Sequence, residues 1–111
     1  FKTLVARGDK TGFVVFCIPV AEELDLKKAA RASKNKSVEL LHVKDLLPTT
    51  GYIRGGCSPV GMKKEFPTYI DETAMLFDAI AVSGGMRGVQ LIVNPDQLLG
   101  FVKGEYVDLT A

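Results

Sequence analysis

The sequence predicts an α+β domain built on a mixed β-sheet. Short apolar runs of strand length alternate irregularly with short helical patterns, giving about six strands and about four short helices. That order is not a strict β-α-β repeat, which favours an α+β fold. At 111 residues, with 47% hydrophobic and 24% charged side chains, the chain matches one globular domain over residues 1–111.

The first eighteen residues predict two strands joined by a turn. Residues 1–6 form a strand-like segment, and two glycines flank Asp and Lys in the turn at 7–12. Residues 13–18 are continuously apolar and short, which is typical of a central strand. Pro19 ends this second strand, because proline cannot donate to a sheet.

A helix and a further strand are expected next. Asp25 can cap a helix through Ser33, whose apolar face carries three residues, Leu26, Ala29 and Ala30. A polar turn at 34–36 leads into a short strand at 38–43 and a helical turn at 43–47.

The second half of the chain repeats such short elements. Asp71 or Glu72 should open a short helix through Phe77, and Pro95 is suited to the first position of a last helix that extends through Phe101. Residues 89–93, V-Q-L-I-V, predict a buried strand. The other expected strands lie at 66–70, 79–82 and 106–109.

The most distinctive segment is the glycine-rich stretch at 50–61, T-G-Y-I-R-G-G-C-S-P-V-G. Glycines allow a backbone to turn sharply and to approach another group closely. The exposed N–H groups of such a loop can bind an anion or a developing oxyanion. A long surface loop without a binding role is the alternative interpretation.

Composition excludes several classes of function. The net charge of +1 gives no global attraction to nucleic acid or membrane, so any RNA contact must come from a local patch. No apolar run approaches the length of a membrane span. One His and two distant Cys do not form a common zinc pattern, and no phosphate-binding loop or nucleophile elbow is present. We expect a cytoplasmic protein without metal or cofactor.

Neither cysteine is predicted to act as a nucleophile. Cys17 lies within an apolar run and is expected to be buried. Cys57 lies in the glycine-rich stretch, but its only possible histidine partner is His42, and nothing in the sequence brings the two together. A disulfide between the cysteines stays open, although the composition is that of an intracellular protein.

Several separate motifs, in order along the chain, resemble one known family. They are F-K-T-L, E-L-D-L-K-K-A-A-R-A-S, G-Y-I-R-G-G-C-S-P-V-G, P-T-Y-I-D-E-T, V-S-G-G-x-R-G and N-P-x-x-L-L. The chain resembles the YbaK/EbsC proteins, the bacterial Cys-tRNA(Pro) deacylases. The resemblance implies a mixed, mostly antiparallel sheet of six to seven strands with short flanking helices. It also implies a further N-terminal segment, which we expect to be missing from this chain.

The resemblance implies a trans-editing function. Prolyl-tRNA synthetase mischarges cysteine, because amino acids of similar size are discriminated weakly. In the family's chemistry the substrate thiol attacks its own ester, so neither a protein nucleophile nor a metal is needed. The implied partners are the acceptor end of tRNA(Pro) and prolyl-tRNA synthetase. Two alternatives remain: an Ala-tRNA(Pro) deacylase of the same fold that uses water, and a non-enzymatic module that binds tRNA or a synthetase.

Site residues follow from the same motifs. The implied catalytic residues are Lys2, Gly56 and Ser83, and the substrate-binding residues are Thr3, Gly55, Cys57, Ser58, Pro59, Gly61 and Gly84. Lys2 would hold the 3′-terminal adenosine region or the ester, and the loop N–H groups would hold the carbonyl oxygen. Structural alternatives are an exposed lysine on an edge strand, a threonine filling the other strand face, and a turn serine. Four further basic residues could contact the acceptor stem: Arg54, Lys63, Lys64 and Arg87.

Overall fold

A long antiparallel hairpin forms the centre of the fold. The computed structural model describes residues 1–41, 66–84 and 89–111. Strands β1 (Lys2–Gly8) and β2 (Gly12–Ile18) pair along their whole length, from Lys2 opposite Ile18 to Gly8 opposite Gly12. Gly12 adopts a positive φ of 76°, which glycine tolerates and which closes the turn. Both predicted strands and the predicted turn are confirmed.

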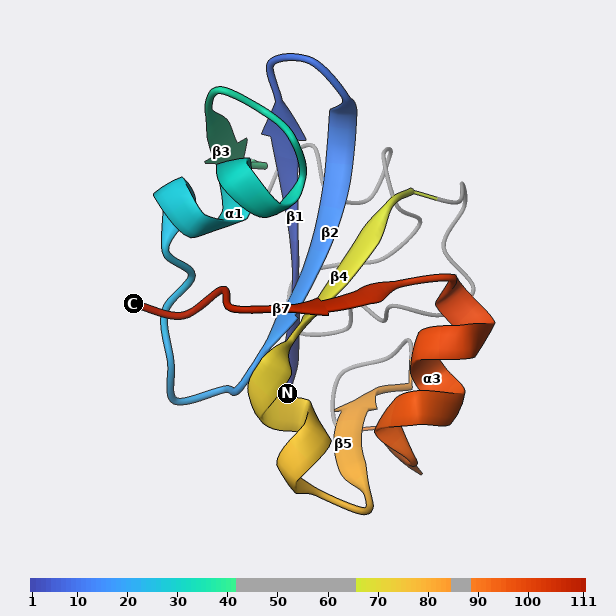
Figure 1. Ribbon diagram of the computed structural model, residues 1–111. Helices are drawn as coiled ribbons and strands as arrows, with labels where there is room; N and C mark the ends of the chain where they lie inside the picture. The colour runs from blue at the N-terminus through green and yellow to red at the C-terminus, as the bar shows by residue number, and fades with distance from the viewer. Residues whose placement is uncertain (42–65, 85–88) are drawn as a thin grey trace.

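Three more strands extend this hairpin into a five-stranded sheet. β3 (Val38–Leu40) pairs antiparallel with β1, whereas β4 (Thr68–Asp71) runs parallel to β2 and β7 (Glu105–Val107) runs parallel to β4. The order is β3-β1-β2-β4-β7 (Figure 1). β2 therefore has a neighbour on both edges, as predicted for a central strand.

A separate two-stranded sheet stands beside the large one. β5 (Ile80–Ser83) and β6 (Gln90–Val93) pair antiparallel, with Ile80 opposite Val93 and Ser83 opposite Gln90. The mixed, mostly antiparallel α+β architecture is thus confirmed. The seven strands in the described ranges are divided between two sheets rather than forming one.

The helices begin where the sequence predicts them. The Asp25 side chain accepts hydrogen bonds from the backbone of Lys27 and Lys28 and caps α1 (Leu26–Ala32). Asp71 likewise caps a 3-10 helix, η1 (Glu72–Leu76), and Asn94 caps α3 (Pro95–Val102). None of the helices in the described part of the chain is long and apolar enough to cross a membrane.

Three apolar clusters pack against the large sheet, and the smallest contains Val5 and Val15. The α1-side core lies between the sheet and α1 and contains Ala6, Val14, Phe16, Ile18, Ala29, Ala30, Val38 and Leu109. The β5-side core lies between the sheet, β5, η1 and α3 and contains Cys17, Ile70, Ala74, Ile80, Val82 and Leu98. Along β1 and β2, residues of the α1-side core alternate with residues of the other two clusters, as strand geometry requires.

Two predictions of burial were wrong. Leu26 was expected on the apolar face of α1, but it begins the helix with 45% of its surface exposed, and only Ala29 and Ala30 are buried there. The strand at 89–93 was expected to be buried, but its residues are largely exposed, with Ile92 at 70%, because no core cluster of the described residues covers the face that carries Ile92. The helical turn expected at 43–47, and the end of the strand at 38–43, lie outside the described residues.

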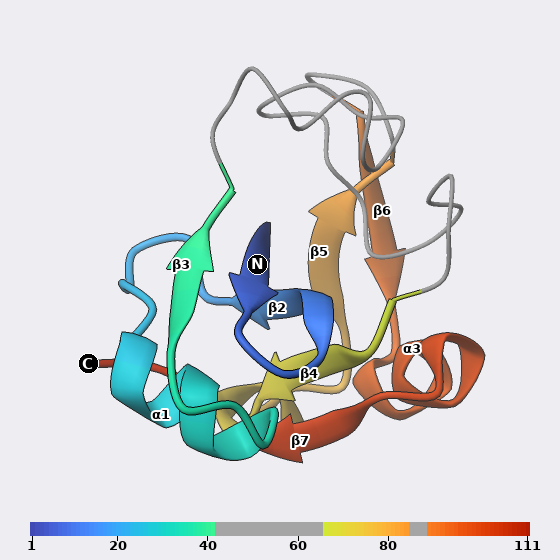
Figure 2. The same cartoon turned by 90° about the horizontal axis from the view of Figure 1, so that it is seen from above.

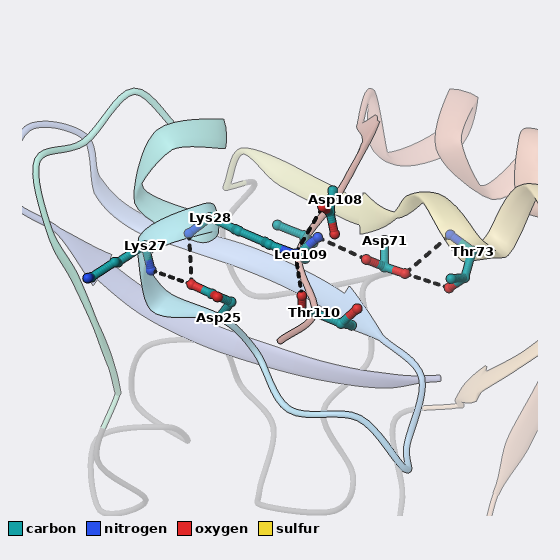
Figure 3. Close-up of polar contacts among 8 residues, drawn as sticks. All are labelled: Asp25, Lys27, Lys28, Asp71, Thr73, Asp108, Leu109 and Thr110. Atoms are coloured by element: carbon teal, nitrogen blue, oxygen red, sulfur yellow. Dashed lines mark hydrogen bonds and ion pairs between the residues drawn. The ribbon is translucent and has the colours of Figure 1, made fainter.

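The last residues of the chain are fastened to the sheet and to α1. Figure 3 shows the buried carboxylate of Asp71 accepting hydrogen bonds from Leu109 N at 2.9 Å and from Thr73 N and Oγ1 at 3.2 and 2.5 Å. Lys28 Nζ donates to the carbonyl of Thr110 at 2.7 Å and pairs with Asp108 at 3.0 Å. These contacts join β4, α1 and the residues after β7.

Candidate functional site

The start of β1 carries two predicted site residues on opposite faces. Thr3 lies opposite Cys17 in the hairpin, with 3.8 Å between Oγ1 and Sγ, and so faces the β5-side core. Lys2 lies opposite Ile18 and by alternation faces the other way. Its side chain is half-buried, and its ammonium has no hydrogen bond or ion pair to another described residue. The structure thus separates Lys2 from Thr3.

Ser83 ends β5 on the side away from the apolar core. Ile80 and Val82 are buried in the β5-side core, whereas Ala81 and Ser83 alternate to the other side and are half-buried. This arrangement confirms that a buried strand runs directly into Ser83, which fixes the backbone from which the hydroxyl projects.

The residue that precedes β1 is hydrogen-bonded to β5. The amino group of Phe1 donates to the carbonyl of Ala81 at 2.8 Å, and the Phe1 ring packs against the β5-side core. Both ribbon views show the start of β1 beside β5 (Figures 1 and 2). The side of β1 that carries Lys2 and the side of β5 that carries Ser83 both face away from the β5-side core, and they lie next to each other where Phe1 meets Ala81.

Lys2 and Ser83 share this surface. Lys2 is one residue from the bonded atom of Phe1, and Ser83 is two residues from Ala81. With strands about 4.8 Å apart and about 3.3 Å per residue, the two Cα atoms lie within roughly 6–11 Å of each other. A long cationic side chain and a hydroxyl at this spacing can bind neighbouring polar groups of one substrate.

Gly84 follows Ser83 and is needed for close packing. Its N–H donates to the carbonyl of Val89 at 2.8 Å, which closes the β5–β6 pair. A Cβ at this position would lie 2.7 Å from Cγ1 of Val89, so only glycine fits without movement. Gly84 thereby holds Ser83 in register. Sequence reasoning missed Val89 as its partner, and the pairing of the two strands around S-G-G was the signal that could have revealed it.

The remaining predicted site residues lie outside the described residues. They are Gly55, Gly56, Cys57, Ser58, Pro59 and Gly61, together with the basic candidates Arg54, Lys63, Lys64 and Arg87. Their roles stay predictions. In residues 1–41, 66–84 and 89–111 no group of three or more His, Cys, Asp or Glu could hold a metal ion.

Comparison with known proteins identifies the family. Residues 1–101 match the model of the aminoacyl-tRNA editing domain. The chain belongs to the aminoacyl-tRNA editing domain family. As an editing domain it is an enzyme that acts on aminoacyl-tRNA, and the resemblance found in the sequence motifs is confirmed.

Relatives of this editing domain have similar sequences and folds. The chain is 58% identical over 110 residues to EbsC of Enterococcus faecalis, provisionally named a Cys-tRNA(Pro)/Cys-tRNA(Cys) deacylase, and the match covers 99% of this chain and 67% of EbsC. A solved structure described provisionally as a trans-editing enzyme for prolyl-tRNA synthetase superposes with a TM-score of 0.89 at 29% identity, over 99% of this chain and 69% of that one. A scaffold protein used for computational epitope grafting superposes with a TM-score of 0.91 at 28% identity, over 99% and 72% of the two chains.

Proposed function

We propose that this editing domain is a trans-acting deacylase that removes cysteine mischarged onto tRNA(Pro). The observation that carries the proposal is the 58% identity to EbsC across nearly the whole chain. The likeness to a trans-editing enzyme for prolyl-tRNA synthetase supports the same substrate. Cys-tRNA(Cys) is a second candidate substrate, because it also stands in the name of EbsC.

The chemistry would come from the substrate itself. The cysteine sulfur attacks the ester carbonyl carbon, the bond from that carbon to the ribose oxygen breaks, and the thiol proton passes to the ribose. The products are a cyclic thioester and free tRNA. Such a reaction asks the protein to hold the ester in a reactive geometry and to stabilise the oxyanion, rather than to supply a nucleophile.

The described residues fit this positioning role. The Lys2 ammonium would hold the 3′-terminal ribose–phosphate region or the ester through a charge-assisted hydrogen bond. Ser83 would bind the amino group or the carbonyl of the cysteine. Gly56 and its neighbours in the glycine-rich stretch would donate backbone N–H groups to the oxyanion, as their sequence predicts. Thr3 faces the apolar core, so its contribution would be to pack β1 beneath Lys2.

Selectivity for tRNA(Pro) would need a partner protein. With a net charge of +1 and only a few clustered basic residues, the domain can neutralise few phosphates, so affinity for tRNA alone should be weak, with a log–log salt slope of roughly −2 to −4. Prolyl-tRNA synthetase, which already holds this tRNA, is the proposed partner, and the cytoplasm is the corresponding location. Tight binding of the isolated domain to tRNA(Pro) alone among several tRNAs would remove the reason for a partner.

The decisive experiment compares three esters of the same tRNA. We expect release of cysteine, and retention of serine and alanine, because serine carries oxygen in place of the attacking sulfur and alanine carries no attacking group. Equal release of cysteine and serine would indicate attack by water. Retention of all three would favour a non-enzymatic binding module.

Lys2→Ala tests the charged contact. We expect the variant to lose about 2–3 kcal/mol of transition-state stabilisation, or roughly 30- to 150-fold in kcat/KM for Cys-tRNA(Pro). Lys10→Ala, an exposed lysine in the β1–β2 turn, is the matched control and should keep normal activity. Near-normal turnover by a folded Lys2→Ala protein would exclude the assigned role.

Cys57→Ser tests whether the domain uses a nucleophile of its own. We expect the variant to keep most activity, because the reaction uses the substrate thiol. A trapped covalent adduct in the parent protein, with complete loss of activity in the folded variant, would show the opposite.

A further inference from the structure

Gln90 lies directly opposite Ser83 in the β5–β6 pair, and no role has been assigned to it. Directly opposed residues of antiparallel strands point to the same face, with Cβ atoms roughly 5 Å apart. Gln90 therefore shares the face of Ser83. Ile92, which lies opposite Ala81, alternates to this face as well.

The three strands lie in the order β1, β5, β6 at this surface. The Ala81 carbonyl is bonded to Phe1, whereas the opposite edge of β5 pairs with β6. Lys2, Ser83 and Gln90 thus lie on three successive strands, and two strand spacings amount to about 10 Å. That span is comparable to the distance from the ester of an aminoacyl-adenosine, across the ribose, to its base.

The chemistry of Gln90 differs from that of its neighbours. Its amide offers a donor and an acceptor side by side without charge, so it is poorly suited to a phosphate and well suited to the edge of a base. A glutamine amide pairs bidentately with N6 and N7 of adenine. Ile92, two residues along the same strand face and 70% exposed, offers the ring an apolar surface. Neither side chain belongs to an apolar core cluster.

We propose that Gln90 recognises the adenine of the 3′-terminal adenosine and is a specificity-determining residue of the editing site. The inference rests on the proposed function, since it takes Lys2 and Ser83 to lie at the ester. The amide of Gln90 donates to N7 and accepts from the N6 amino group, and the base lies over Ile92. Adenine binding on β6 then fixes the ribose and the ester against β5 and β1.

The test pairs a variant with a modified substrate. Cysteine is esterified to tRNA(Pro) that ends either in adenosine or in purine riboside, which lacks the N6 amino group. The parent protein should turn over the purine riboside substrate about 10-fold more slowly in kcat/KM, mainly through KM. Gln90→Ala should be slow on both substrates and should no longer distinguish them, whereas Gln90→Glu, which keeps the acceptor for N6 but lacks the donor to N7, should be slow on both and should still distinguish them. Gln97→Ala, an exposed glutamine on α3, should behave as the parent does.

An equilibrium measurement separates this inference from the proposed function. Uncharged RNA hairpins with the two 3′ ends are titrated against each protein by fluorescence anisotropy, which requires no catalysis. The parent should prefer adenosine by a similar factor, and Gln90→Ala should show no preference. Release of cysteine from neither substrate would overturn the deacylase function alone if this binding preference remained. Equal binding of both ends by the parent, or a preference that survives Gln90→Ala, would overturn the role of Gln90.

Discussion

Gly84→Ala is expected to destabilise the domain by about 2 kcal/mol. The new Cβ would lie 2.7 Å from Cγ1 and 3.3 Å from the carbonyl oxygen of Val89, whereas carbon atoms pack best at about 3.5–4.0 Å. Val89 has a stiff side chain, so relief requires the backbone to move. Overpacking of this kind costs about 1–3 kcal/mol. The shift would also displace Ser83, so deacylation should fall more than stability alone explains.

Urea unfolding followed by circular dichroism measures the loss, and deacylation is assayed at a temperature where both proteins are folded. A Val89→Ala background removes Cγ1, the atom nearest to the new Cβ. In that background Gly84→Ala should cost less than half as much. Gly100→Ala is the matched control: no atom lies within 4 Å of its Cβ position on α3, so the change should stabilise by about 0.5–1 kcal/mol. An equal cost of Gly84→Ala in both backgrounds would refute the reasoning.

Three further outcomes are expected. Gly8→Ala should lower the free energy of unfolding in urea by about 2–4 kcal/mol. Its Cβ would lie 2.2 Å from Nδ2 of Asn35 and would expel this side chain, which is hydrogen-bonded to the β1–β2 turn and to Ser33 at the end of α1. Additive costs of Gly8→Ala and Asn35→Ala would contradict this. Asp71→Ala should lower the free energy of unfolding by about 3 kcal/mol, because the buried N–H of Leu109 loses its acceptor. Each kcal/mol should lower the thermal midpoint by roughly 4–8 °C, so a midpoint within about 2 °C of the parent would exclude this role. Burial and a hydrogen bond to Asp96 raise the pKa of Tyr106 to about 12 from 10.0, so the stabilising contribution of Tyr106 is complete below pH 10.0 and is lost towards pH 12. Tyr106→Phe should abolish this part of the pH dependence of the free energy of unfolding. An unchanged pH profile in the variant would contradict the assignment.

Local patterns determined what the sequence could predict. The β1–β2 hairpin, the Asp25 and Asn94 caps and the strand before Ser83 depend on nearby residues, and all were predicted. The motifs also predicted Lys2 and Ser83 as site residues, although only their alternation and the Phe1–Ala81 bond show that they share a surface.

The features that the sequence did not predict depend on contacts between residues far apart in the chain. V-Q-L-I-V has the composition of a buried strand, but burial depends on what packs against the faces of the strand, and Ile92 stays 70% exposed. Gln90 was not predicted as a site residue, because nothing in its immediate sequence indicates that it lies opposite Ser83. The acceptor role of Asp71 towards Leu109, 38 residues away, has no local signature.

The fastening of residues 108–110 has a consequence for synthesis on the ribosome. Leu109 fills the α1-side core, and its N–H satisfies the carboxylate of Asp71, yet it is made after every strand and helix described here. Until Leu109 leaves the exit tunnel, the α1-side core lacks one of its side chains and the Asp71 carboxylate lacks one of its hydrogen-bond donors. Folding should therefore complete only when these residues have emerged, and a released chain truncated after Val107 should remain more sensitive to protease than the full sequence.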